Sequence, residues 1–265
     1  MHIKIIVNPR AGNGKAREIG HEVEKHLCKK GIEYGLDSTF RPGGATSLAK
    51  KAVRDGFDMI IAVGGDGTVN EIANGIIGSS AIMAIIPAGT QNNFSKLLGL
   101  NPKNIAQACD IALSGNVKNI DVGKINDKFF LNDIGIGLTA DIAKGFDMIK
   151  MFSKIFKFEP PHLKIKMGDI AVDSKIVMTK ISNTGSDGQF DVCLFNDTDK
   201  FKLMYHLPRY FAGNEKSAPL SKYKSENITI DSEDPLQVVC DGEFIACASK
   251  YNISFSQEKI PVKSR

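Results

Sequence analysis

The stretch VGGDGTVNEI, Val63 to Ile72, decides how the N-terminal part of this chain folds. It begins at the end of the apolar run MIIAV, residues 59–63, which is typical of a strand buried on both faces. A turn needs one or two glycines, whereas this one places three around the carboxylate of Asp66. Glycine lets the backbone approach a bulky group because it has no Cβ. A helix that starts here would present N–H groups and a positive dipole end, which suit phosphate.

The aspartate in this turn indicates a metal. An anion beside a phosphate is unfavourable unless a cation lies between them, so Asp66 implies Mg²⁺ together with a nucleoside triphosphate. The alternative is a tight strand-to-helix turn in which Asp66 or Thr68 only caps the helix. Two familiar phosphate loops are excluded, because residues 8–16 (NPRAGNGKA) fail both the Walker pattern and the dinucleotide G-x-G-x-x-G pattern.

The first 119 residues alternate in type. Short apolar runs and segments of helical spacing follow one another at 3–7, 14–30, 48–53, 59–63, 69–77 and 81–86. This alternation predicts an α/β lobe over residues 1–119, with an open, mostly parallel sheet and flanking helices. Such sheets bind ligands beyond the carboxyl ends of their strands.

The texture changes after about residue 119. Residues 120–265 contain short, often alternating segments split by polar turns, which predict an antiparallel β-sandwich lobe. We expect two packed lobes with a cleft between them, and the last strand is a candidate to pack back on the first lobe.

Composition sets limits on function. The 265 residues are 42% apolar and 24% charged, as in an ordinary globular protein, and the net charge of +4 lacks the dense basic stripe of a nucleic-acid binder. Five cysteines without a C-x-x-C pair fit reduced thiols in the cytoplasm. No stretch is apolar for the about 18 residues that a spanning helix needs. We expect a cytoplasmic protein, with peripheral contact at the inner membrane surface.

Three further motifs make the glycine turn specific. Asn8-Pro9 ends the first strand, PAGTQNNF at 87–94 follows one strand–helix unit after the turn, and Asp-Gly-Glu stands at 241–243. This ordered set resembles the diacylglycerol kinase catalytic-domain family, which includes bacterial lipid kinases and sphingosine kinases. The resemblance extends over nearly the whole chain, whereas GGDGT alone is shared with the NAD kinases. It implies that ATP and an acceptor lipid meet between two lobes.

The resemblance also implies roles for matching residues. Glu243 would be the general base, with Asp241 beside it, and Asp66 would act at the triphosphate and its Mg²⁺. Asp187 would belong to a structural Mg²⁺ loop with Thr184 and Gln189 as further ligands. The residues that would contact ATP are Asn8, Lys15, Thr39, Gly64, Gly65, Asp66, Gly67, Thr68, Asn70, Glu71, Gly89, Thr90 and Asn92. By themselves, Asp241-Gly242 and Asp187-Gly188 are also ordinary turn signals.

Two departures from the family pattern keep alternatives open. Asn93 stands where the family usually has an aspartate that supports a metal–water network, and the loop at 182–188 is shorter than is often found. From the resemblance we expect an ATP- and Mg²⁺-dependent lipid kinase that acts on a diacylglycerol-like hydroxyl. The alternatives are a nucleotide- or lipid-binding pseudokinase and an NAD-kinase-like enzyme with a soluble acceptor. The lipid, the regulators and the oligomeric state, including a homo-oligomer, stay open.

Residues 148–158 are a candidate membrane contact. On a helix, Lys150, Lys154 and Lys157 form a basic stripe, and apolar side chains form another, as in an interfacial helix. The alternative is an ordinary amphipathic helix that covers the β lobe. Lys200, Lys202 and Arg209 are interpreted as surface charge.

Overall fold

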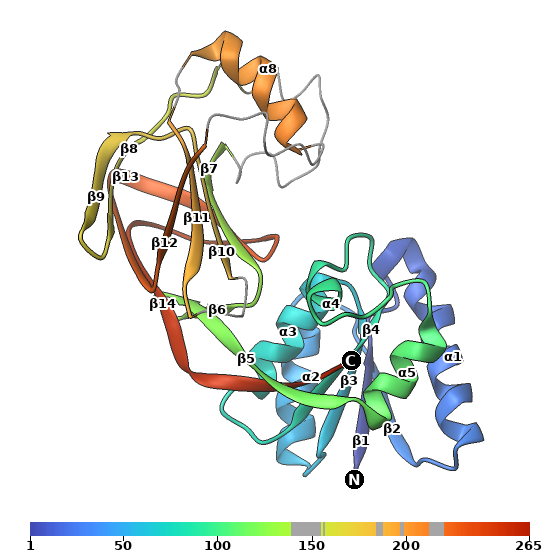
Figure 1. Ribbon diagram of the computed structural model, residues 1–265. Coiled ribbons are helices and arrows are strands. Elements are labelled where there is room, and N and C mark those ends of the chain that lie inside the picture. The colour runs from blue at the N-terminus through green and yellow to red at the C-terminus, as the bar shows by residue number, and fades with distance from the viewer. Residues whose placement is uncertain (139–154, 156, 184–187, 197–198, 212–219) are drawn as a thin grey trace. The chain divides into compact units, whose positions relative to one another are not determined.

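The computed structural model describes the whole chain except residues 139–154, 156, 184–187, 197–198 and 212–219 (Figure 1). It consists of two compact units. The first contains Met1–Val122 and Gln257–Arg265, and the second contains Gly123–Ser256. The chain passes between the units within two strands, β5 (Asn116–Ile125) and β14 (Glu243–Ser264). The C-terminal segment therefore belongs to the first unit, where Val262 pairs in parallel with Met83.

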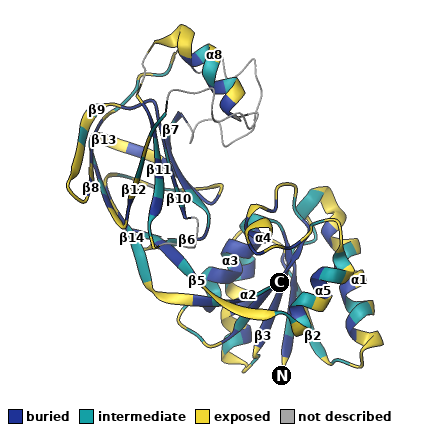
Figure 2. Cartoon of the chain, in the orientation of Figure 1, coloured by how far each residue is buried: buried dark blue, intermediate teal, exposed yellow. Residues whose placement is uncertain are grey.

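The first unit is built on a parallel sheet. Its strands β1 (Ile3–Val7), β2 (Tyr34–Ser38), β3 (Met59–Gly64) and β4 (Ile82–Pro87) lie in the order β4-β3-β1-β2. Every residue of β3 is buried (Figure 2), because this strand lies between β1 and β4 and is covered on both faces. The continuous apolar run at 59–63 predicted this position, and the mostly parallel α/β sheet is confirmed.

Helices cover this sheet. They are α1 (Lys15–Lys29), α2 (Gly44–Arg54), α3 (Asp66–Ile76), α4 (Asn93–Leu97) and α5 (Ile105–Ser114), with a 3₁₀ turn at Ala11–Gly14 before α1. In α1 the buried residues Ala16, Val23 and Leu27 recur at helical spacing and join the core beneath the sheet. Helices α2 and α3 pack closely, since a Cβ on Gly75 would lie 2.6 Å from the Cβ of Ala49.

The second unit is rich in antiparallel strands. They are β6 (Lys128–Phe130), β7 (Asp133–Gly137), β8 (His162–Met167), β9 (Ile170–Lys175), β10 (Met178–Asn183), β11 (Phe190–Phe195), β12 (Ser221–Ser225) and β13 (Asn227–Cys240). The ladder runs β12-β11-β10-β7-β13-β14, with β8 and β9 attached to β13. Helix α8 (Lys200–Phe211), which lies in the described part of this unit, packs on it. The expected antiparallel second region is confirmed.

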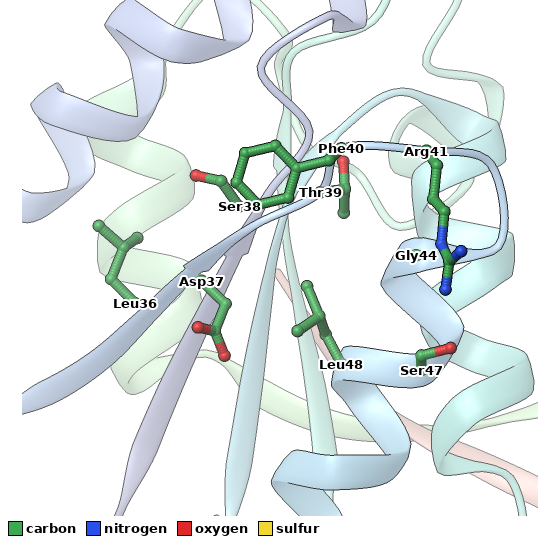
Figure 3. A pocket seen from close by; sticks show the side chains of 9 residues that line it. All are labelled: Leu36, Asp37, Ser38, Thr39, Phe40, Arg41, Gly44, Ser47 and Leu48. Carbon is green, nitrogen blue, oxygen red and sulfur yellow. The ribbon is translucent and has the colours of Figure 1, made fainter.

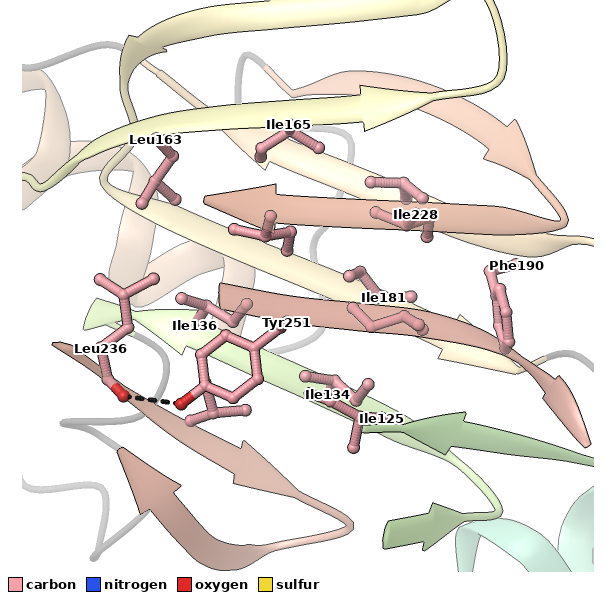
Figure 4. Close-up of a cluster of buried hydrophobic side chains, with 14 of the residues drawn as sticks. Ile125, Ile134, Ile136, Leu163, Ile165, Ile181, Phe190, Ile228, Leu236 and Tyr251 are labelled. Atoms are coloured by element: carbon pink, nitrogen blue, oxygen red, sulfur yellow. Dashed lines mark hydrogen bonds between the residues drawn. The ribbon is translucent and has the colours of Figure 1, made fainter. Parts of the chain in front are cut away.

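Strand alternation forms the core of this unit (Figure 4). In β8, Leu163, Ile165 and Met167 point inward while the residues between them are exposed, which is the period-2 pattern of a half-buried strand. The buried hydroxyl of Tyr251 acts both as a donor and as an acceptor of hydrogen bonds. It donates to the Leu236 carbonyl at 3.0 Å and accepts from the Ala248 N–H at 2.8 Å. Paired polar groups of this kind make burial of a tyrosine hydroxyl tolerable.

Candidate functional site

Three loops meet at the carboxyl edge of the parallel sheet in the first unit. They follow β1, β3 and β4, which are neighbours in register. The N–H of Asn8 donates to the Val63 carbonyl at 2.9 Å, and the N–H of Ala88 donates to the Gly64 carbonyl at 2.8 Å. These bonds continue the strand ladders into the loops. The sequence prediction placed a ligand site at this edge.

Glycines let these loops touch. A Cβ on Gly65 would lie 3.0 Å from the Cα of Gly89, and one on Gly89 would collide with the Cα of Gly65. A Cβ on Gly12 would collide with the Ala88 carbonyl, and Gly12 itself has φ of +59°. A side chain is therefore excluded at each of these three glycines, where the loops meet.

A side-chain pair fixes the start of the glycine turn. The Asn8 Nδ2 donates to the Thr68 Oγ1 at 2.9 Å, and the Asn8 Oδ1 accepts from the Arg10 N–H at 3.1 Å. Thr68 is buried and lies over Gly64, where a Cβ would be 2.5 Å from the threonine Cβ. Two residues predicted to contact ATP thus hold the loops of β1 and β3 together.

Asp66 binds a different helix from its own. Its carboxylate accepts the N–H groups of Asn93 at 3.1 Å and Phe94 at 3.0 Å, so it caps α4. Helix α3 starts at Asp66, and its N-cap Gly65 provides no side-chain cap. Helix α1 likewise follows a glycine, Gly14, which provides no side-chain cap. The capping alternative expected Asp66 to cap the helix after the turn, α3, whereas its carboxylate caps α4. The N-cap residue of α3, Gly65, makes no side-chain cap.

Two more predicted ATP contacts have structural partners. The side-chain amide of Asn92 closes a ring with Gly89, donating to its carbonyl and accepting from its N–H, each at 2.8 Å. The Glu71 carboxylate accepts the N–H groups of Gly43 at 2.9 Å and Ala45 at 2.8 Å, which caps α2. Sequence reasoning missed this cap because the two segments are far apart in the chain.

The remaining predicted residues of this edge differ in exposure. Lys15, the first residue of α1, and Thr90 are exposed, while Gly67 is partly buried in the first turn of α3. Asn70 is buried and accepts the side-chain amide of Asn74 on both its backbone and side-chain oxygens.

A pocket of about 520 Å³ opens beside Thr39 (Figure 3). Thr39 is buried, and its N–H donates to the Val7 carbonyl at 2.8 Å, which places it at the same edge as Asn8. The pocket is lined from the β2 side by Leu36 and Phe40 and from α2 by Leu48, with Arg41 and Ser47 among its polar residues. Sequence reasoning identified Thr39 but no other lining residue, because nothing in the local pattern marks Phe40 or Leu48 as neighbours.

In the second unit, Asp241 and Gly242 form the two-residue turn between β13 and β14, with φ of +48° and +84°. The Asp241 carboxylate is buried and accepts three backbone N–H groups, from Leu131 at 2.7 Å, Asn132 at 2.8 Å and Asp133 at 2.9 Å. Burial raises its pKa from 3.8 to about 6, although the three hydrogen bonds act in the opposite direction.

Glu243 lies just after this turn. It is exposed and stands opposite Cys240 at the end of the hairpin. Asp187 and Thr184 of the proposed metal loop lie outside the described residues, as do 148–154 and 156 of the expected membrane segment, and Gln189 is partly buried. Within the described part of the chain, no three histidine, cysteine or acidic side chains gather into a metal-binding group.

The first unit is thus a parallel sheet with a glycine-rich edge, and the second unit is rich in antiparallel strands. The family follows from comparison with known proteins. Residues 2–125 match the family model described as the diacylglycerol kinase catalytic domain. A diacylglycerol kinase of Bacillus subtilis (strain 168) is 26% identical over 270 residues, covering 91% of this chain and 89% of the relative.

Solved structures agree with this family. A crystal structure of a diacylglycerol kinase from Bacillus anthracis str. Sterne superposes with a TM-score of 0.77 at 25% identity, covering 100% of this chain and 97% of that one. An NAD kinase from Archaeoglobus fulgidus in complex with ATP has a TM-score of 0.55 at 14% identity, covering 100% and 94%, which shows the fold alone. The resemblance to the diacylglycerol kinase family is confirmed, and the matches identify the chain as a kinase. None of its described helices has the length and apolar character to cross a membrane.

Proposed function

We propose that the protein transfers the γ-phosphoryl group of ATP, bound with Mg²⁺, to the hydroxyl of a diacylglycerol-like membrane lipid. The observation that carries this proposal is the edge of the first unit where Gly12, Gly65 and Gly89 bring three loops into backbone contact. Such an edge, which carries no side chain at these three positions, suits the oxygens of a triphosphate.

The helix N-termini supply the phosphate-binding groups. α1 and α3 both begin at this edge after glycines that provide no side-chain cap. The first N–H groups of a helix have no partner within the helix, and they carry the positive end of its dipole. Exposed Lys15 adds a cation at the start of α1. We assign the triphosphate to this place.

The pocket beside Thr39 is the proposed place for the purine. Phe40 is 82% exposed and Leu36 is 41% exposed, so the pocket offers apolar surface that a ligand can cover. An aromatic base can cover such side chains, and the polar residues of the rim can fix its orientation.

Phe40→Ala should raise the KM for ATP about fivefold with little change in kcat, whereas Val117→Ala, at another exposed apolar residue, should change neither. An unchanged KM would place the base elsewhere.

The residues fit Mg²⁺ delivered with ATP. Mg²⁺ in kinase sites is usually held by one or two carboxylates together with phosphate oxygens and waters. Asp66 supplies one partly buried carboxylate at the glycine edge, and its two hydrogen bonds to α4 fix the orientation of that carboxylate. Mg²⁺ there would neutralise charge on the transferring phosphoryl group.

Glu243 is the proposed general base for the lipid hydroxyl. It is an exposed carboxylate fixed at the end of a hairpin, and the turn before it is held by the buried bonds of Asp241. A base of this kind contributes about 10²–10⁴-fold to rate. In this proposal Asp241 positions the turn, and Glu243 accepts the proton.

Phosphate transfer from radiolabelled ATP to diacylglycerol in mixed micelles tests the proposal. Asp66→Asn keeps an acceptor for α4 but removes the charge, so it should lose nearly all transfer. Glu243→Gln should lower kcat at least about 10²-fold while ATP affinity stays the same. Asp169→Asn, at an exposed turn of the second unit, is the matched control and should behave as the wild type. Full turnover in the Asp66 variant, or no transfer to any lipid by the wild type, would refute the proposal.

A second candidate is a nucleotide-binding protein without transfer. It is favoured by one observation: Asn93 carries no charge, its backbone N–H donates to the Asp66 carboxylate, and its side-chain amide donates to the Gln91 side-chain oxygen. Isothermal titration with Mg-ATP separates the two candidates. Tight ATP binding without transfer to diacylglycerol in the micelle assay would favour this second candidate.

A further inference from the structure

Helix α8 carries an exposed face that the proposed catalysis does not use. Phe201 is 78% exposed and Tyr205 is 56% exposed, and they lie one helical turn apart. Arg209 follows one turn later, also exposed. The three side chains therefore form a single stripe along the helix. Large aromatic side chains seldom face water on this scale without a partner.

The opposite face of α8 anchors it to the second unit. Leu203, Leu207 and Tyr210 are buried in a cluster that includes Val177 and Phe195. At its N-terminus, the Asp199 carboxylate accepts the N–H groups of Phe201 at 2.8 Å and Lys202 at 3.3 Å. The helix is thus capped and packed on one side, while Phe201 and Tyr205 remain exposed. Figure 2 shows that α8 has both buried and exposed stretches.

The charge on this face identifies the partner. Helix α8 contains Lys200, Lys202 and Arg209 and no acidic residue. All three cations are exposed. The Arg209 guanidinium lies 3.7 Å from the centre of the Tyr205 ring and also donates to the Tyr205 carbonyl at 2.6 Å. Exposed aromatic rings flanked by cations match the boundary between acyl chains and anionic headgroups.

We propose that this stripe, made of Phe201, Tyr205 and Arg209 with the neighbouring lysines, docks the protein on an anionic lipid bilayer. Phe201 and Tyr205 enter the headgroup region, and the cations face lipid phosphates. This inference rests on the proposed function and deepens it, because the proposed lipid acceptor lies in the bilayer on which the protein docks. It replaces the interpretation of Lys200, Lys202 and Arg209 as plain surface charge.

Tryptophan fluorescence tests insertion directly, because the chain contains no tryptophan. The Phe201→Trp variant of the full chain, mixed with vesicles of phosphatidylglycerol and phosphatidylcholine, should show a blue shift of its emission. Ile170→Trp is the matched control, since Ile170 is an exposed apolar residue of the same unit, and its emission should not shift. No shift in the Phe201 variant, or equal shifts in both variants, would overturn the proposal.

Vesicle sedimentation without ATP gives the size of each contribution. Phe201→Ala should weaken binding about tenfold, and Arg209→Ala about fivefold. Ile170→Ala and Lys175→Ala, two exposed control positions, should stay within about twofold of the wild type. Binding should fall as salt rises and should be weak on pure phosphatidylcholine. Unaltered binding of the α8 variants would overturn the proposal, as would binding that ignores lipid charge.

The failure of docking and the failure of catalysis are distinguishable. Transfer to a short-chain diacylglycerol dispersed as monomers needs no bilayer, so Phe201→Ala should keep wild-type turnover on it and lose turnover on vesicles. If the wild type phosphorylates neither form but Phe201→Trp still inserts, the proposed function fails and the docking surface stands. A loss of turnover on both forms by Phe201→Ala would overturn the docking role.

Discussion

Asp66 and Asp241 both accept backbone hydrogen bonds through their carboxylates, but they differ in burial. Each stands before a glycine, Asp66 at the start of α3 and Asp241 in a hairpin turn. Each carboxylate accepts backbone N–H groups from a segment distant in sequence. Asp66 accepts two and is partly buried, whereas Asp241 accepts three and is buried. The comparison teaches that an Asp-Gly pair does not define a role. Access to solvent does, because a ligand or metal can reach only the carboxylate that keeps an open side.

The largest expected effect tests the buried member of the pair. Asp241→Ala leaves three enclosed N–H groups without their acceptor, at about 1–3 kcal/mol each and less than additively, so the free energy of unfolding should fall by on the order of 4 kcal/mol. Urea denaturation measures this loss. Asp169→Ala, at an exposed turn, should stay within about 0.5 kcal/mol of the wild type. A loss below about 1 kcal/mol for Asp241→Ala would remove the distinction between the two aspartates.

The pH dependence of stability is the next effect. Because burial raises the pKa of Asp241 from 3.8 to about 6, the folded state holds this proton more tightly than the unfolded state. The stability that this group contributes is therefore present at low pH and is lost as the pH rises from 3.8 to about 6. The loss amounts to on the order of 3 kcal/mol.

Urea titrations over this pH range, compared with Asp241→Asn, isolate that contribution. The asparagine does not titrate, so the difference in unfolding free energy between wild type and variant should change across the window. A constant difference would show that Asp241 keeps an ordinary pKa.

Two glycines sharpen the comparison: Gly89, which contacts Gly65 of the glycine turn, and Gly242, which follows Asp241. A Cβ on Gly89 collides with the backbone of Gly65, so Gly89→Ala should cost about 2 kcal/mol and should also weaken ATP binding. A Cβ on Gly242 meets nothing within 4 Å, so Gly242→Ala should cost only the roughly 1 kcal/mol of a left-handed backbone. Thermal unfolding and ATP titration test both variants. Equal costs would mean that loop contact at the first edge is less tight than the geometry indicates.

The smallest stability effect belongs to Asp66. Asp66→Ala removes the cap of α4, a short and partly exposed helix, and should lower the unfolding free energy by about 1 kcal/mol. Urea denaturation of this variant beside Asp241→Ala completes the comparison. A loss as large as that of Asp241→Ala would make Asp66 a structural residue first, and any loss of turnover would then have to be judged on Asp66→Asn alone.

Local patterns predicted much of the fold. The continuous apolar run at 59–63 indicated a strand covered on both faces, and β3 is buried throughout. The period-2 alternation of 162–167 likewise matches β8. These predictions succeeded because backbone geometry repeats over a few residues, and burial leaves its mark at the same period. The change of texture near residue 119 also marked the end of the α/β alternation.

The partners of the site residues were beyond such patterns. Nothing near Glu71 indicates that it caps α2, and nothing near Asp66 indicates α4. The three donors to Asp241 lie more than a hundred residues earlier in the chain. The aromatic stripe of α8 was present in the sequence, but only the buried positions of Leu203 and Leu207 show which face remains exposed.

The sequence by itself determined the kinds of element, the glycine-rich edge and the residue types available for phosphate and proton chemistry. Those properties depend on short-range sterics and on side-chain chemistry, which neighbouring residues set. Only the tertiary structure decided which carboxylate is enclosed, which helix each acid caps and which face of α8 meets solvent. Those outcomes depend on burial and on hydrogen-bond partners brought from far along the chain, and no local pattern encodes them.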